Sequence, residues 1–177
     1  MSLPSKLIPG LGIFIVASTL FISFGCQSSI DTEITYEEAS VLLDRYMETM
    51  TESDMALIDE IISPEFVLRS PMFPEPIVGI EGYKALVTNT ARTFSDFTAT
   101  IDEIVVHGDQ LWGRFSMSGT NTGPLGELPP TNKSFSITGL AVTRVADGMI
   151  VEDETFWNVL DLYQQLGFTL TPPPGQQ

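Results

Sequence analysis

The spacing of apolar residues predicts three helices in the first half of the chain. From Thr35 onward, apolar side chains recur every three or four positions, which is the period of a helix with one buried face. Thr35 and Glu38 form a capping box at the start of the first helix, because a hydroxyl and a carboxylate at this spacing can each accept a hydrogen bond from a free backbone N–H. A second helix is expected from residue 53 or 54 to the Ser63–Pro64 pair, and a third over residues 80–94. Between these two helices, "EFVLRS" is expected to form a short strand and "PMFPEP" a loop at the mouth of a cavity.

After residue 96 the apolar period changes from that of a helix to that of a strand. Residues 97–106 alternate, "HGD" predicts a turn, and "QLWGRFSMSGT" predicts the returning strand. A glycine- and proline-rich loop over 121–132 precedes two more strands, joined by an Asp-Gly turn that is typical of hairpins. Helices followed by strands indicate an α+β fold, with a curved antiparallel sheet wrapped around the N-terminal helices and a cone-shaped pocket between them. The folded domain is expected over 35–168 and a disordered tail over 169–177.

The first 25 residues have the layout of an export signal. One lysine precedes a long uncharged apolar run, and Cys26 follows it directly. A single cysteine cannot form an intrachain disulfide, and its position is similar to the lipidated cysteine of bacterial lipoproteins. We therefore expect a signal peptide over 1–25, lipidation of Cys26 and a tether over 26–34. An uncleaved membrane anchor and ordinary secretion are the alternatives, and all three place the domain outside the cytoplasm, at a bacterial membrane, in the periplasm or on the cell surface.

Charge and composition narrow the classes of function. The chain has 8 basic and 23 acidic residues, a net charge of −15, which argues against nucleic acid as a partner. With one histidine, His107 in the "HGD" turn, and one cysteine, the chain has no residues for a zinc or Cys–His site. It also contains no calcium loop and no phosphate loop, so we predict no metal and no cofactor.

Seven short segments carry a resemblance to a known family. "IISPEFV", "GIEGYKAL", "FSDF", "GTNTG", "LPP", "ADGMIVE" and "DLYQQLG" occur in this order over residues 36–168. Together they resemble the SnoaL-like polyketide cyclases and related ester cyclases of the nuclear transport factor 2-like superfamily. The resemblance implies a curved sheet and cone, and a cofactor-free intramolecular aldol reaction in which one carboxylate serves as general acid and base. It also implies homodimers formed through the outer face of the sheet.

The sequence departs from this family at the residues that carry the chemistry. Counted from the shared segments, the family's acid, histidine and asparagine fall on Thr155, Ala141 and Leu68. Each change removes an ionisable or amide group. The resemblance therefore implies that the pocket is kept while the cyclase machinery is altered.

Asp153 is the best candidate for a replacement acid or base. If Thr155 faces the cone, strand alternation turns Asp153 and Trp157 to the same side and Glu152 and Glu154 outward. The alternative for Asp153 is a solvated position at the edge of the sheet, or an ion pair with a basic residue.

Arg114 and several aromatic residues are the candidate ligand contacts. Arg114 lies mid-strand, where burial would require a carboxylate partner such as Asp153 or an anionic ligand. Trp112, Phe115 and Trp157 are expected to line the core or the cavity, and Asn158 to add a polar contact.

Three functions remain open at this stage. The first is binding of a small, mostly apolar molecule in the cone, through these aromatic residues with Arg114, Asn158 and Asp153 as polar contacts. The second is a cofactor-free cyclase, isomerase or hydrolase that uses Asp153, with Thr155, in place of the family's acid. The third is a non-catalytic assembly module that dimerises through the outer sheet face.

Overall fold

The computed structural model describes residues 34–169 and 171. The predicted signal peptide, Cys26 and nearly all of the predicted tether and tail lie outside the described residues. The resemblance covered residues 36–168, so the whole of that segment can be compared with the structure.

The three predicted helices are present, with one boundary changed. α1 (Tyr36–Glu52) begins at the predicted capping box, where the Glu38 N–H donates to Thr35 Oγ1 over 3.3 Å and the Thr35 N–H donates to Glu38 Oε2 over 3.0 Å. α2 (Met55–Ile61) is capped by Asp54, and α3 (Gly79–Thr93) follows after two short strands. α2 ends before the Ser63–Pro64 pair, because Ile62 is already extended and begins a strand.

Six strands form one sheet, and a short helix closes the chain. The strands are β1 (Ile62–Arg69), β2 (Ile77–Val78), β3 (Thr98–His107), β4 (Gln110–Thr120), β5 (Ser134–Ala146) and β6 (Met149–Trp157), in the order β2-β1-β6-β5-β4-β3. α4 (Val159–Gln165) follows β6.

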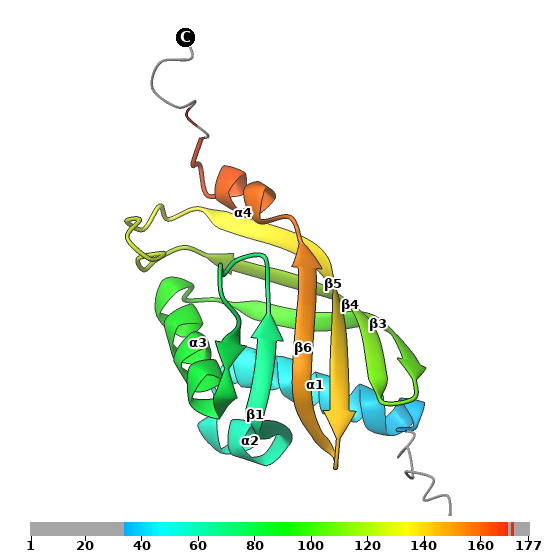
Figure 1. The fold of residues 1–177 in the computed structure, drawn as a ribbon. Helices are drawn as coiled ribbons and strands as arrows, with labels where there is room; N and C mark the ends of the chain where they lie inside the picture. The colour runs from blue at the N-terminus through cyan, green and yellow to red at the C-terminus, as the bar shows by residue number, and fades with distance from the viewer. Residues whose placement is uncertain (1–33, 170, 172–177) are drawn as a thin grey trace, which may run out of the picture.

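The α+β fold is confirmed, with one parallel pair that the sequence did not predict. β1 and β6 run parallel, and all other neighbours are antiparallel. More than half of the described residues lie between these two strands in the sequence, so no tight turn fixes their relative direction. Figure 1 shows the strongly curved sheet, with α1 crossing behind it, α3 at one side and α4 at one end.

Two groups of buried apolar side chains occupy the inner side of the sheet. The larger group joins α1, α2, α3 and β1, and includes Leu43, Ile58, Phe66 and Val87. The smaller group lies toward α4 and consists of Phe94, Phe135, Ile137, Leu162 and Leu166. The two groups leave a hollow between them, which side chains of both groups line.

A β-bulge at the base of the last hairpin sets the orientation of β6. Val145 pairs with Ile150, but Arg144 pairs with Glu152, so Val151 has no partner of its own on β5. Ile150 and Asp153 are both buried although they are three positions apart, a spacing that would place them on opposite faces of a regular strand. The bulge thus turns Asp153 inward and Glu152 outward.

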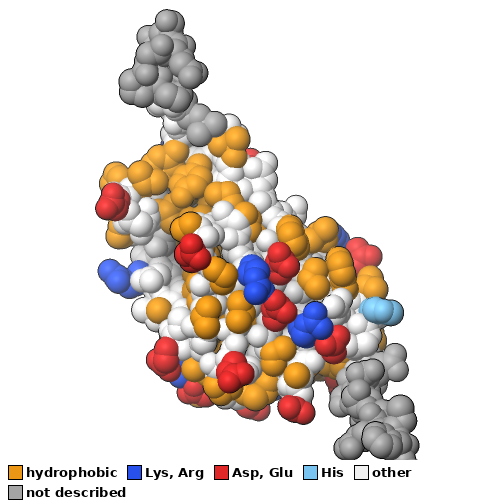
Figure 2. All heavy atoms as spheres, in the orientation of Figure 1, with side chains coloured by type: hydrophobic (Ala, Val, Ile, Leu, Met, Phe, Trp, Pro, Cys, Tyr) orange, Lys and Arg blue, Asp and Glu red, His pale blue; other side chains and the backbone are white. Residues whose placement is uncertain are grey.

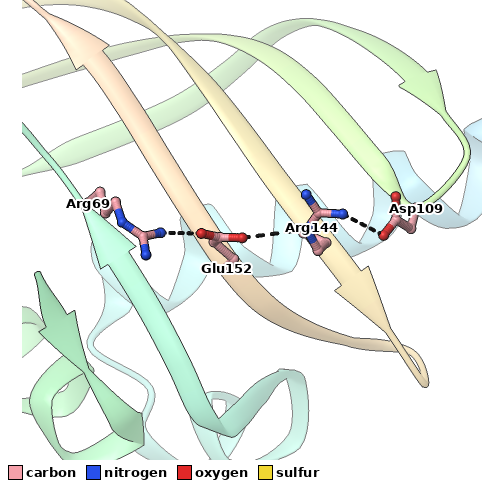
Figure 3. Close-up of polar contacts among 4 residues, drawn as sticks. All are labelled: Arg69, Asp109, Arg144 and Glu152. Atoms are coloured by element: carbon pink, nitrogen blue, oxygen red, sulfur yellow. Dashed lines mark hydrogen bonds and ion pairs between the residues drawn. The ribbon is translucent and has the colours of Figure 1, made fainter.

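The outer face of the sheet carries a row of ion pairs. Arg69 of β1 pairs with Glu152, whose other oxygen lies 3.5 Å from Nε of Arg144, and Arg144 Nη1 reaches Asp109 Oδ2 at 2.9 Å (Figure 3). Figure 2 shows acidic and basic side chains interspersed with hydrophobic ones on this side of the molecule. Since these groups are partly exposed, each pair stabilises the fold only slightly.

Candidate functional site

The inner side of the sheet encloses a mostly apolar cavity of about 580 Å³. Helices α1 and α3 form one wall, strands β3 to β6 form the other, and the loops before α3 and after β4 contribute to the rim. Its exposed lining residues are Asn89 and Arg92 near the end of α3 and Pro124 and Gly126 of the loop after β4, so the mouth lies between these segments. Ser70, Met72 and Phe73 line it as well, in agreement with the predicted place of the proline-rich loop.

Asp153 borders this cavity from β6 and is 3% exposed. Thr143, directly opposite on β5, donates its hydroxyl to Asp153 Oδ1 over 2.7 Å. Tyr46 of α1 donates its phenol to Asp153 Oδ2 over 3.2 Å. The alternative of a solvated edge position is therefore wrong, and the carboxyl is held between a helix and a strand.

A second layer of hydroxyls fixes Tyr46. Its ring stacks on Tyr83 of α3, with centroids 5.6 Å apart and the planes inclined by 25°. The Tyr83 phenol lies 2.8 Å from Thr49 Oγ1, and Thr49 donates to the Tyr46 carbonyl oxygen over 2.7 Å. Tyr46, Thr49 and Tyr83 are all buried, so this network connects α1 and α3 behind the carboxyl.

Burial changes the acidity of these groups. Desolvation raises the pKa of Asp153 to about 6, although the hydrogen bonds from Thr143 and Tyr46 act in the opposite direction. Desolvation, together with the charge of Asp153, raises the pKa of Tyr46 well above its usual value, and Tyr83 is raised mainly by desolvation. Tyr46 therefore remains a hydrogen-bond donor near neutral pH, whereas Asp153 can take up or release a proton.

Besides Asp153, three of the predicted site residues lie where the sequence placed them. Thr155, Trp157 and Phe115 line the cavity, and Glu154 on the other face is exposed. The Thr155 hydroxyl donates to the Arg69 carbonyl oxygen over a long 3.4 Å. The alternation inferred for β6 is thus confirmed, while the roles of these side chains stay predictions.

Arg114, Trp112 and Asn158 do not line the cavity, so their predicted contacts with a ligand are wrong, while the predicted ion pair of Arg114 forms with a carboxylate other than Asp153. Arg114 and Trp112 alternate with Gly113 and Phe115 and lie on the outer sheet face. Arg114 pairs there with Asp102, at 3.1 Å, and with Glu103, and it is separated from Asp153 by the sheet itself. Asn158 caps α4 by accepting the Asp161 N–H over 3.1 Å.

The three positions that differ from the family meet on one part of the cavity wall. Thr155 pairs with Ala141 across β5 and β6, and Leu68 of β1 pairs with Asp153. All three border the cavity. Their small or apolar side chains leave Asp153 as the ionisable group of this wall.

Sequence reasoning missed Tyr46 and Thr143 as partners of Asp153. A signal for Tyr46 was present, because a phenol within the apolar stripe of a helix requires a buried hydrogen-bond partner. Thr143 could not be found by counting, since a regular hairpin around Asp147–Gly148 would pair Asp153 with Val142, and only the bulge moves Thr143 opposite it.

Within residues 34–169, no three histidine, cysteine, aspartate or glutamate side chains are grouped as a metal site would require. No helix of the described part is both long and apolar enough to cross a membrane.

The fold and the cavity define a cone-shaped α+β protein in which the described residues contain one buried acid, Asp153. Residues 40–166 match the model of the SnoaL-like polyketide cyclases, and the chain belongs to this family. Aklanonic acid methyl ester cyclase of Streptomyces peucetius is 27% identical over 137 residues, which cover 76% of this chain and 94% of that enzyme.

Solved structures show the same fold. TsrD of Streptomyces laurentii superposes with a TM-score of 0.68 at 27% identity, over 76% of this chain and 98% of that one. IdmH of Streptomyces antibioticus, a candidate polyketide cyclase, superposes with a TM-score of 0.64 at 30% identity, over 73% of this chain and 99% of that one. The nuclear transport factor 2-like architecture implied by the sequence is therefore confirmed.

Proposed function

We propose that this protein binds a small, mostly apolar molecule in its cavity and exchanges a proton with it through Asp153, as a cofactor-independent enzyme of the cyclase type. The observation that carries the proposal is the position of Asp153, a carboxyl 3% exposed at the wall of an apolar cavity, with a pKa of about 6. Such a group can accept and return a proton near neutral pH without a metal or cofactor.

The polar partners support a proton-transfer role. Thr143 and Tyr46 hold both carboxylate oxygens, so the group is oriented before a substrate arrives. A ligand that fills the mostly apolar cavity would displace water, which would otherwise compete for the proton.

The first compound to test is aklanonic acid methyl ester, which the names of two Streptomyces relatives give as their substrate. The full chain is incubated with it in D₂O, and product formation and deuterium uptake are followed by mass spectrometry. We expect turnover or exchange by the native protein, loss in Asp153→Asn, and retention in Glu154→Gln, which makes the same change on the outer face of the same strand. Equal exchange in all three proteins would refute the role of Asp153.

A carrier is the second candidate, and the lost polar groups favour it. With Leu68, Ala141 and Thr155, the wall around Asp153 has fewer ionisable and amide side chains than the family's pattern implies. A ligand that stays bound through purification and is released unchanged, seen by native mass spectrometry, would support a carrier. A bound molecule that is converted by the native protein but not by Asp153→Asn would support the enzyme.

We propose in addition that the outer sheet face pairs with a second copy of the chain. Val105, Trp112, Leu140 and Phe156 lie on this face and are each more than half exposed. The basic residues of the face, Arg69, Arg114 and Arg144, are paired with acids of the same face, so this surface carries charges of both signs among apolar side chains, although the chain has a net charge of −15. Such a surface suits a like-charged copy better than a basic partner.

Analytical ultracentrifugation tests this interface. The native chain is expected to sediment as a dimer, Trp112→Glu as a monomer, and Val41→Glu, an exposed apolar position on α1, as a dimer. A native monomer at high concentration would refute the interface.

Export and lipid anchoring remain a proposal that rests on residues 1–26. Fractionation of expressing cells, with mass spectrometry of the N-terminal peptide, should find a lipid on Cys26. Cys26→Ser should release the domain from the membrane fraction. A native chain found in the cytoplasm with residues 1–25 intact would contradict the assignment.

A further inference from the structure

The hydroxyl groups around Asp153 at the inner end of the cavity already donate their hydrogens in hydrogen bonds within the protein. Thr143 donates to Asp153 Oδ1, and Tyr46 donates to Asp153 Oδ2. Thr49 has a single hydrogen, which it donates to the Tyr46 carbonyl oxygen. In the contact of 2.8 Å between Thr49 and Tyr83, the phenol of Tyr83 must therefore be the donor.

What remains free at this end are acceptors. Each oxygen of an ionised carboxylate can accept two hydrogen bonds, and each oxygen of Asp153 has one protein donor. The phenol oxygens of Tyr46 and Tyr83 also keep lone pairs, because both groups act here as donors. Thr155, two residues further along β6, donates its hydroxyl to the Arg69 carbonyl oxygen over 3.4 Å. The cavity wall around Asp153 therefore presents mainly hydrogen-bond acceptors, because the hydroxyl hydrogens named here are donated to protein atoms.

The described residues place no basic side chain against Asp153. Arg69 and Arg144, on the strands that flank β6, point to the outer face and pair with Glu152 (Figure 3). The one basic residue of the described chain that lines the cavity is Arg92, which is exposed near the mouth. The carboxylate therefore receives hydrogen bonds but no opposite charge from its surroundings.

The mouth has the opposite character. Asn89 and Arg92 carry N–H groups there and are exposed. A molecule that lies along the cavity would meet donors at the mouth, aromatic side chains along the walls and acceptors at the inner end. This polarity selects an orientation as well as a class of ligand.

We infer that the ligand of this cavity presents a hydrogen-bond donor, a hydroxyl or an ammonium group, to Asp153, on an apolar and largely aromatic body. The inference rests on the proposed function in one respect, that the cavity is the binding site. A ligand whose buried end carried only a carbonyl or an ether oxygen would face acceptors with an acceptor, and both would lose their hydrogen bonds with water. A donor would instead complete the set of hydrogen bonds around the carboxylate, and an ammonium group would also gain from the aromatic walls.

Matched aromatic probes test this choice with the full chain at pH 7.5. The probes are 2-naphthol, 2-methylnaphthalene, 2-methoxynaphthalene and 2-naphthylmethylamine, and their dissociation constants are measured by calorimetry or fluorescence. We expect 2-naphthol to bind at least about tenfold tighter than the methyl and methoxy compounds, as for loss of a hydrogen bond to a charged group. Tighter binding of the amine than of the naphthol would support an ammonium ligand, and the reverse a hydroxyl ligand.

Two variants test whether Asp153 is the residue that causes the preference for 2-naphthol. Asp153→Asn replaces one acceptor oxygen by an NH₂ group, so the advantage of 2-naphthol over 2-methoxynaphthalene should fall about tenfold or reverse. Glu154→Gln, with the same change on the outer face, should keep the native ratio. An advantage that persists unchanged in Asp153→Asn would overturn the inference, and the native comparison stands even if that variant does not fold.

Different results would overturn the claim that the cavity binds a ligand and the claim that this ligand carries a hydrogen-bond donor. Equal binding of the donor and non-donor probes would overturn the inference about the ligand and leave the cavity as a binding site. No binding of any probe would overturn both, because each of them is small relative to the cavity.

Discussion

The ring of Phe115 occupies the place that a side chain at residue 139 would need. A Cβ built on Gly139 would lie 2.4 Å from Cζ of Phe115 and 2.9 Å from the carbonyl oxygen of Phe156. Phe115 lines the cavity, so this contact between neighbouring strands helps to set the position of the cavity wall.

Gly139→Ala is therefore expected to displace the Phe115 ring and destabilise the fold by about 1–3 kcal/mol, the usual cost of overpacking. Gly113→Ala is the matched control, because a Cβ there meets its nearest atom at 3.7 Å, an ordinary contact. Urea denaturation of the two variants measures the difference. Equal stability of both would contradict the contact.

The raised pKa of Asp153 predicts a pH dependence of stability. Because the folded pKa, about 6, exceeds the usual value of 3.8, the folded state binds the proton more tightly than the unfolded state. The stabilising contribution is complete below pH 3.8 and is lost as the pH rises to about 6, with a difference of about 3 kcal/mol.

Asp153→Asn removes this titration. The stability of the variant relative to the native protein should therefore increase between pH 4 and pH 7, by an amount of that order. Glu154→Gln should follow the native curve. Denaturation at a series of pH values checks this, and parallel native and Asp153→Asn curves would show that the carboxyl is not buried.

Tyr46→Phe should raise the pKa of Asp153 further, because the phenol donates to the ionised form and favours it. Loss of the hydrogen bond should also lower the free energy of unfolding by about 1 kcal/mol. Carboxyl-carbon NMR titration gives the pKa, with the Asp153 signal assigned by its absence in Asp153→Asn.

Tyr83→Phe separates this effect from loss of a buried hydroxyl elsewhere in the network, because both substitutions keep the aromatic ring. Tyr83 forms a hydrogen bond with Thr49 and not with Asp153. Tyr83→Phe should therefore lower stability but change the pKa of Asp153 less than Tyr46→Phe does. Equal shifts in both variants would mean that the network acts on the carboxyl as one unit.

Deletion of Val151 should be tolerated. Without it, a regular hairpin around Asp147–Gly148 pairs Arg144 with Glu152 and Thr143 with Asp153, which is the register already present. Deletion of Glu154 has no such compensation and should turn Phe156 inward and Trp157 outward.

We expect the Glu154 deletion to be less stable than the Val151 deletion by at least about 2 kcal/mol, as befits disruption of a buried face. Thermal unfolding of both variants, with the Asp153 titration of the Val151 deletion, tests this. Similar stabilities would show that the bulge does not control the orientation of β6.

The helices and the hairpins could be predicted from the sequence, because each follows from local periodicity or a turn motif. The inward direction of Asp153 rested instead on the family resemblance, which places Thr155 in the cone, and on strand alternation between these two residues, which both lie beyond the bulge. The placement of both Trp112 and Phe115 in the cavity could not hold, since residues three apart on a regular strand point to opposite faces. Pairing of Arg114 with Asp153 failed for a related reason, as β5 lies between their strands and the two side chains are on opposite faces.

Two features of the site had no local signal. The bulge falls at Val151, and a valine at that place carries no mark of irregular backbone, unlike glycine. The approach of Tyr46 to Asp153 joins residues 107 positions apart, so it depends on the path of α1 across the sheet and not on any local pattern.

The bulge at Val151 also divides the last hairpin into two parts that can be engineered separately. If deletion of Val151 is tolerated as predicted, the strand between the turn and Val151 could contain the extra residue or lack it without reversing which side chains beyond it face the cavity. A peptide tag or reporter inserted at the exposed Asp147–Gly148 tip would lie on the turn side of the bulge, away from Asp153. The side chains at the inner end of the cavity would keep their positions. This tip is therefore a suitable attachment point for a reporter that senses binding in the cavity.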